Sequence, residues 1–157
     1  MQTQGWSWFA QITGFTGVLG RSWDSIPDDQ KPFQARLMEV AAGYAEHADV
    51  QAGRVFDEIE RLGYGQNTLI FYIWGDNGSS GEGQDGTISE LLAQNGIPTT
   101  VPMHIAALDE LGGLDVLGSP LTDNQHHAAW AWTGSSPYQG MKLLASKSAV
   151  TLPAGSG

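Results

Sequence analysis

The sequence predicts an α/β fold, and two neighbouring features indicate it. Hydrophobic residues recur at three- and four-residue steps from about residue 33 to 62, which is the period of one long amphipathic helix. After a short turn, Thr68–Trp74 is an uninterrupted apolar run of strand length, typical of a strand that is buried on both faces. Helix, short loop and buried strand together make one half of an α/β repeat.

The helix has predicted boundaries at both ends. Asp28 and Asp29 suit a helix start, and Pro32 is tolerated because it falls in the first turn. Gly63 is a natural left-handed stop. Two short helices are predicted next, one from Ser89 through Gln94 and one over Ile105–Leu111 that Gly112-Gly113 stops. Residues 114–135 are predicted to be irregular. A last helix is predicted from Ser136-Pro137 through about Ala145.

A strand that is buried on both faces requires neighbouring strands, and the sequence contains no convincing partner for Thr68–Trp74. The chain therefore supplies one helix and one strand of a sheet, but not the sheet. We expect it to be part of something larger, with an exposed apolar edge that promotes aggregation.

Composition restricts the classes of partner. The chain has 157 residues, enough for one domain with a core, and no cysteine, which excludes disulfides and thiolate chemistry. Its net charge of −10 disfavours nucleic acid and anionic membranes. We expect no signal peptide and no membrane span, because the sequence lacks an apolar run of the required length.

Asp76-Asn77-Gly78 follows the predicted strand directly and has two interpretations. Asn-Gly is a strong hairpin signal, and the local residues favour a simple turn. No second alternating strand follows, however, and ligands of α/β sheets bind beyond the carboxyl ends of the strands, where Asp76 and Asn77 would stand.

Three other patterns have both a functional and an ordinary interpretation. Gly81–Gly86 matches a dinucleotide-binding glycine pattern but begins several residues after the strand, which argues against that function. His126-His127 suits packing or surface exposure better than metal binding, although either ring could approach a pocket if residues 114–135 fold over it. Lys142, considered alone, is an ordinary solvated helix lysine.

Blocks along the chain resemble the arylsulfatase-type (type I) sulfatases of the alkaline-phosphatase-like superfamily. The resemblance covers residues 23–146, as a central fragment, whereas residues 1–22 and 147–157 diverge and are expected to be poorly ordered. The blocks that carry it are Trp23–Ser25, Arg36–Val40, Tyr44–Asp49, Gly53–Val55, Leu62-Gly63, Asn67–Ile70, Gly75–Ser80, Gly86-Thr87, Leu108–Gly113, Ala129–Trp132 and Ser136–Lys142.

The resemblance implies a partial alkaline-phosphatase-like sandwich, with one long helix, one buried strand and irregular loops. It implies that Asp76 and Asn77 are ligands of a divalent cation, Ca²⁺ or Mg²⁺, and that Lys142 contacts the sulfate group of a sulfate-ester substrate. The family's nucleophile is a formylglycine made from Cys or Ser in a C/S-x-P-x-R motif. No catalytic nucleophile is expected in this chain, because it has no cysteine and Ser135–Gln139 ends in Gln where Arg is required.

We therefore expect a fragment of a metal-dependent sulfuric ester hydrolase that is inactive alone, with frame changes in the coding sequence at both ends. The alternative is a noncatalytic acidic module that binds a cation or a partner.

Overall fold

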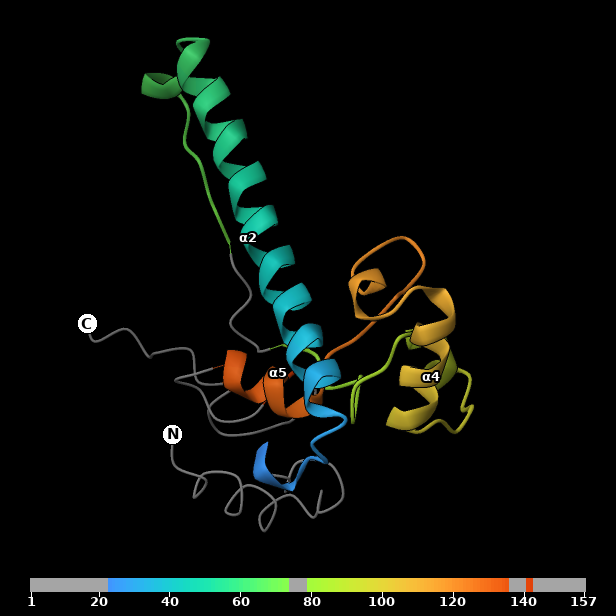
Figure 1. The fold of residues 1–157 in the computed structure, drawn as a ribbon. Coiled ribbons are helices and arrows are strands. Elements are labelled where there is room, and N and C mark those ends of the chain that lie inside the picture. Colours follow the sequence, from blue (N-terminus) through green and yellow to red (C-terminus); the bar gives the residue numbers. More distant parts are fainter. Residues whose placement is uncertain (1–22, 74–78, 136–140, 143–157) are drawn as a thin grey trace, which may run out of the picture.

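The computed structural model describes residues 23–73, 79–135, 141 and 142. In these ranges the chain is mostly helical, with two isolated β-bridges, Thr87 with Gln125 and Ser89 with Asp123. The elements are the α-helices α2 (Lys31–Arg61), α3 (Glu90–Gln94), α4 (Val101–Leu111) and α5 (Ala128–Gly134), and the 3-10 helices η1 (Trp23–Ser25), η2 (Gly65–Asn67) and η3 (Leu114–Val116). Figure 1 shows α2 extending well beyond the part of the structure that contains α4 and α5.

The long helix is confirmed, and α2 differs from its predicted range by only one or two residues at each end. Pro32 lies at its start, where a missing N–H costs nothing. At its end, Gly63 takes a left-handed conformation (φ +78°). The N–H of Gly63 donates to Glu60 O (2.9 Å), and that of Tyr64 donates to Ile59 O (3.1 Å). These are the two hydrogen bonds of a Schellman ending.

The core lies beside the first two turns of α2 and not along its length. Of the α2 side chains, Phe33, Gln34 and Leu37 are the buried ones. The main buried cluster joins α2, α4 and the loops beside them, and consists of Phe33, Leu37, Ile88, Val101, Leu108 and Leu117. A smaller cluster joins Ala128 and Ala131 of α5 to Met141. The apolar stripe of α2 therefore continues far beyond the core that covers its start.

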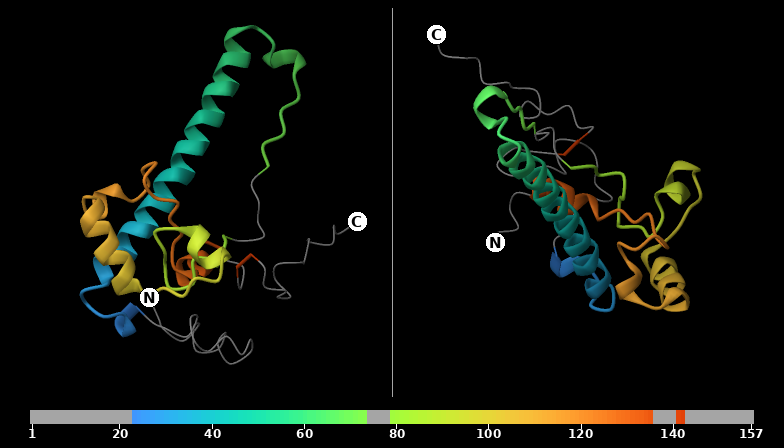
Figure 2. Two further views of the ribbon diagram at one scale, coloured as in Figure 1. Left: turned by 90° about the vertical axis from the view of Figure 1, so that its right-hand side faces the viewer. Right: turned by 90° about the horizontal axis from the view of Figure 1, so that it is seen from above.

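The predicted buried strand does not form in this chain. Residues 68–73 have no regular secondary structure and are exposed, with Leu69, Phe71 and Ile73 each at least 78% accessible. Figure 2 shows this segment returning from the far end of α2. Its described contacts with α2 come from Tyr72, whose hydroxyl donates to Asp49 (3.1 Å) and whose ring meets Phe56 edge-on. The physical reason is the absence of neighbouring strands in the described part of the chain, so the sandwich implied by the resemblance stays a prediction.

The shorter elements agree in part. The helix predicted from Ser89 is present as α3. Gly112 (φ +119°) ends α4 as predicted. However, α4 begins at Val101, four residues before its predicted start, and has a proline in its first turn. The prediction of irregular structure over 114–135 was wrong for α5 and η3. The predicted helix from Ser136 to Ala145, and the divergent segments 1–22 and 147–157, fall largely or wholly outside the described residues.

No helix in the described ranges combines the length and apolar character needed to cross a bilayer.

Candidate functional site

Lys142 lies against the chain segment that follows the predicted metal-binding turn. Asp76 and Asn77 are outside the described residues, but Ser79, two positions after Asn77, is described. The backbone N–H of Lys142 donates to the carbonyl oxygen of Ser79 at 3.0 Å, across 63 positions of sequence (142 − 79). The lysine side chain is exposed. The fold thus brings Lys142 close in space to a residue that adjoins Asp76-Asn77 in the sequence.

Ser79 is fixed by three hydrogen bonds to three different parts of the chain. Besides the bond from Lys142, its N–H donates to Ser135 Oγ at 3.3 Å, and its hydroxyl lies 2.9 Å from His126 Nε2. Ser135 is itself buried at the end of α5, where its hydroxyl donates to Ala131 O at 2.7 Å. Helix α5 and the segment before it therefore hold the backbone that follows the predicted turn.

His126 forms a pair with Ser79, and the described part of the chain supplies no third member of a hydrolase triad. Burial lowers the pKa of His126 below its ordinary value near 6.5, so the imidazole is neutral at pH 7. Its Nδ1 is buried and has no hydrogen-bond partner among the described residues, whereas a triad requires a carboxylate there. The contact with Ser79 joins the segment before α5 to the residue that follows the predicted turn.

The neighbouring His127 has a structural role. Its ring is buried, and its Nδ1 accepts a hydrogen bond from the N–H of Ala129 at 2.9 Å, which caps the start of α5. Of the two fates that the sequence favours for these histidines, packing and surface exposure, His127 shows packing. His126 lines the cavity beside α2 that is described below, whereas its approach to a site at Asp76 and Asn77 stays a prediction.

The glycines of the Gly81–Gly86 pattern face protein atoms. A Cβ on Gly83 would collide with the carbonyl oxygen of His126, and one on Gly81 would collide with the Met141 side chain. Gly86 has φ +93°, and a Cβ there would approach Leu37 to 2.7 Å. Close packing with the loop and with α2 therefore accounts for these glycines, and no phosphate is needed to explain them.

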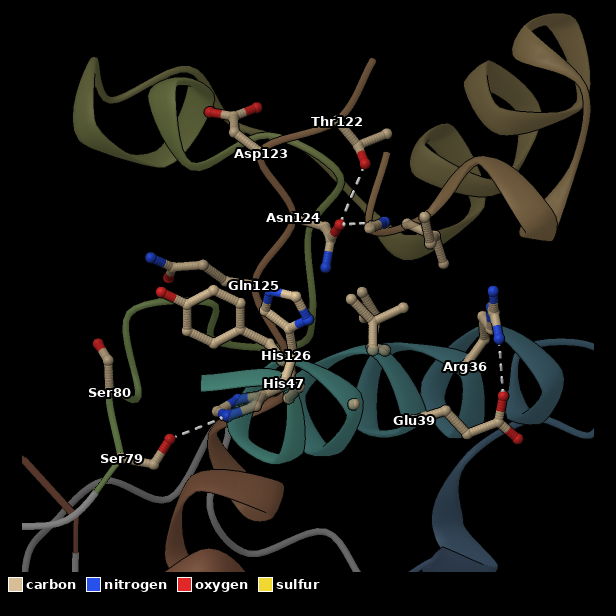
Figure 3. A pocket seen from close by; sticks show the side chains of 17 residues that line it. Arg36, Glu39, His47, Ser79, Ser80, Thr122, Asp123, Asn124, Gln125 and His126 are labelled. Carbon is tan, nitrogen blue, oxygen red and sulfur yellow. Dashed lines mark hydrogen bonds and ion pairs between the residues drawn. The ribbon is translucent and has the colours of Figure 1, made fainter. Parts of the chain in front are cut away.

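A cavity of about 910 Å³ lies between the first half of α2 and the segment 117–126, with Ser79 and Ser80 at one end. We call it the α2 groove. Figure 3 shows Arg36, Glu39 and His47 on the α2 side and residues 122–126 on the other. The volume is in the range of small-molecule sites, which is about 300–1,000 Å³. No pattern in the sequence predicts the groove, because its two walls lie far apart along the chain.

The predicted cation ligands form a chemically suitable but incomplete set. A carboxylate and a carboxamide supply the hard oxygen ligands that Ca²⁺ and Mg²⁺ prefer, and these ions need several more ligands. Across residues 23–73, 79–135, 141 and 142, no group of three or more His, Cys, Asp or Glu side chains could hold a metal ion. Asp76 and Asn77 lie outside these ranges, so their role as cation ligands stays a prediction.

Sequence reasoning selected Lys142 but missed Ser79, Ser135 and the α2 groove. Ser79 could have been noticed because it follows Asp-Asn-Gly directly. Its partners are 47, 56 and 63 positions away, and no local pattern indicates which distant residue a serine will meet.

Comparison with known proteins gives partial similarity to sulfatases. No protein-family model matches the chain, and no solved structure matches it significantly. An uncharacterized sulfatase of Schizosaccharomyces pombe (strain 972 / ATCC 24843) is 38% identical over 65 residues, covering 41% of this chain and 12% of that protein. An arylsulfatase of Klebsiella aerogenes is 27% identical over 62 residues, covering 40% of this chain and 13% of that protein.

The matched stretch thus spans about an eighth of the length of these curated relatives. Over about 40% of its own length, this chain is similar to sulfatases.

Proposed function

We propose that this chain is part of a sulfatase that hydrolyses sulfate monoesters at a divalent-cation site. In this proposal Asp76 and Asn77 are cation ligands and Lys142 binds the sulfate group. The observation that carries it is the hydrogen bond from the Lys142 N–H to Ser79 O, 3.0 Å long, because it brings the predicted sulfate lysine beside the segment that follows the predicted ligands. The partial similarity to two sulfatases supports the same proposed function.

The proposed roles follow from the chemistry of the side chains. A lysine ammonium is a compact point charge, which suits the non-bridging oxygens of a sulfate ester as negative charge shifts in the transition state. A bound divalent cation would supply further positive charge at the same oxygens. The three hydrogen bonds of Ser79 would keep the turn and the lysine in a fixed relation, which is what preorganised charge stabilisation requires.

Calcium titration by calorimetry tests the cation part of the proposal. We expect the intact chain to release or absorb heat on calcium binding, weakly, because Asp76 and Asn77 are only part of a ligand set. Asp76→Ala should abolish that heat. Asp115→Ala is a matched control, because Asp115 is an exposed acid of η3, distant in sequence from the turn. Binding that survives Asp76→Ala would contradict the assignment.

We also predict that the chain alone does not turn over a chromogenic aryl sulfate, because it contains neither cysteine nor a Ser-x-Pro-x-Arg sequence. The assay is release of the coloured phenol by the purified chain with calcium present. Turnover that is lost in Lys142→Ala would show that another group in this chain acts as the nucleophile.

A noncatalytic partner-binding module is the second candidate, favoured by the exposed apolar side chains of Leu69, Phe71 and Ile73. This candidate predicts no dependence of sulfate binding on Lys142. Inorganic sulfate binding, followed by nuclear magnetic resonance in the intact chain and in Lys142→Ala, separates the two candidates.

A further inference from the structure

Asn95-Gly96 is an exposed asparagine–glycine pair that directly follows α3. Both residues are exposed, and Gly96 has φ +66° with nothing within 4 Å of the position that a Cβ would occupy. The Asn95 side chain turns back on the helix, and its Nδ2 donates to Leu91 O at 2.7 Å. The described part of the chain thus gives the carboxamide one hydrogen bond and leaves the pair open to water.

The end of α3 beside this pair is weakly held. The helix has five residues, too few for a helix to be stable by itself. Its start is fixed to Asp123, whose carbonyl oxygen accepts from the Glu90 N–H at 3.1 Å and whose carboxylate accepts from the Leu91 N–H at 3.4 Å. Around its end, Leu91 and Ile97 are 61% and 50% exposed, so they bury little apolar surface. Such an end opens locally at little cost in free energy, which frees the Gly96 nitrogen to approach the carboxamide.

An open asparagine–glycine pair converts itself without an enzyme. The backbone nitrogen of Gly96 attacks Cγ of Asn95, and the new N–Cγ bond closes a five-membered succinimide ring. The Cγ–Nδ2 bond breaks, and ammonia leaves with the proton from the Gly96 nitrogen. Water then opens the ring at either carbonyl, which yields aspartate or isoaspartate. Glycine favours the ring closure, because it has no Cβ to obstruct the attack.

We propose that Asn95 is a site of spontaneous deamidation, and that its product loosens α3 from Asp123. The reaction changes the net charge of the chain from −10 to −11 (−10 − 1). A carboxylate at position 95 has no N–H to donate to Leu91 O, and it places negative charge beside the carbonyl end of a helix. Asp123 also lines the α2 groove, so the modification acts on one wall of that groove. The proposal does not depend on sulfate-ester chemistry.

Peptide mapping of the intact chain by mass spectrometry, during incubation near neutral pH, tests the modification. Cleavage after glutamate releases residues 91–110, which contain Asn95 as their one asparagine and exclude the second asparagine–glycine pair, Asn77-Gly78. We expect residues 91–110 to gain the mass of an amide-to-acid exchange. The product should separate into aspartate and isoaspartate forms, because the ring opens at either carbonyl. An aspartate form alone would contradict the ring mechanism.

Asn124 is a matched control within the same molecule. Gln125 follows it, and its Oδ1 accepts from the Gly118 N–H at 2.9 Å and from the Thr122 hydroxyl at 3.0 Å. A following side chain and a fixed carboxamide both raise the barrier to ring closure. We therefore expect Asn95 to convert at least about tenfold faster than Asn124. Equal rates at the two asparagines overturn the proposal.

Asn95→Gln tests which side chain reacts. Glutamine keeps the carboxamide but would have to close a less favourable six-membered ring, so residues 91–110 should stay unmodified over the same period. Conversion at the wild-type rate would assign the reaction to the neighbouring Gln94 and overturn the assignment to Asn95.

Asn95→Asp reproduces the aspartate product and tests the effect on α3. We expect amide hydrogen exchange at Glu90 and Leu91 to be severalfold faster in Asn95→Asp than in the wild type, because these are the N–H groups that Asp123 holds. Exchange at Ala129, which His127 caps, should be unchanged. Wild-type exchange at Glu90 and Leu91 in this variant would overturn the loosening of α3.

Discussion

At the residue scale, His104 links stability to pH. It is buried in α4 with 4% exposure, and its ring is stacked on Phe33 with centroids 6.5 Å apart. Burial lowers the pKa of His104 below its ordinary value near 6.5. The unfolded chain therefore takes up a proton first as pH falls. The stability contributed by the neutral ring is complete above pH 6.5 and declines as pH falls from there through the lowered pKa.

We predict that the free energy of unfolding, measured by urea titration, falls between pH 7.5 and pH 5 in the wild type. In His104→Gln that fall should be smaller. Burial also lowers the pKa of His126, so a His104→Gln, His126→Gln double variant should show a still flatter profile. Equal pH slopes in the wild type and the double variant would refute this linkage.

At the element scale, α2 contains two glycines that no contact requires, and it ends on one that the backbone requires. Gly43 and Gly53 lie inside the helix with open space at the Cβ position, whereas Gly63 has φ +78°. Gly→Ala at either internal position should stabilise the helix by about 0.5–1 kcal/mol, because glycine loses more backbone entropy. Gly63→Ala should cost roughly 1–2 kcal/mol through left-handed strain.

Thermal unfolding followed by far-ultraviolet circular dichroism measures all three alanine variants. The opposite signs at Gly43 and Gly63 are the informative outcome, since both are the same substitution in or beside the same helix. A stabilising Gly63→Ala would contradict the Schellman ending described for α2.

At the scale of the whole molecule, apolar surface is left uncovered where α2 leaves the core. Leu69, Phe71 and Ile73 alternate along an exposed segment and are 79%, 78% and 86% accessible. Residues 68–73 contain no charge, glycine or proline, which is the composition of a segment prone to intermolecular β-pairing. Exposed, uncharged segments of this kind favour self-association.

We therefore predict concentration-dependent self-association that Phe71→Lys suppresses by placing a charge in the segment. Sedimentation velocity over a range of concentrations measures it. Val50→Lys is the control, since Val50 is an exposed apolar residue of α2 (48%) outside the segment. A monomeric wild type would contradict the predicted self-association. Equal suppression by both variants would show that residues 68–73 are not its specific cause.

The sequence by itself determined the local features. The 3.6-residue period and the glycine stops predicted α2 and the ends of α2 and α4, because these depend on neighbours within a few residues. It also identified Lys142 and the Asp76-Asn77 turn through family resemblance, and the roles of these residues stay predictions. It did not predict α5, which His127 caps through a side-chain hydrogen bond in a stretch without a clear periodic pattern.

Only the tertiary structure decided which distant residues meet. The contacts of Ser79 with His126, Ser135 and Lys142, and the two walls of the α2 groove, depend on long-range packing. The conformation of the apolar run at residues 68–73 also depends on long-range contacts, in this case on contacts that are missing among the described residues. Its composition favours a buried strand, yet a strand is made by hydrogen bonds to neighbours, and without them in the described chain the segment remains exposed.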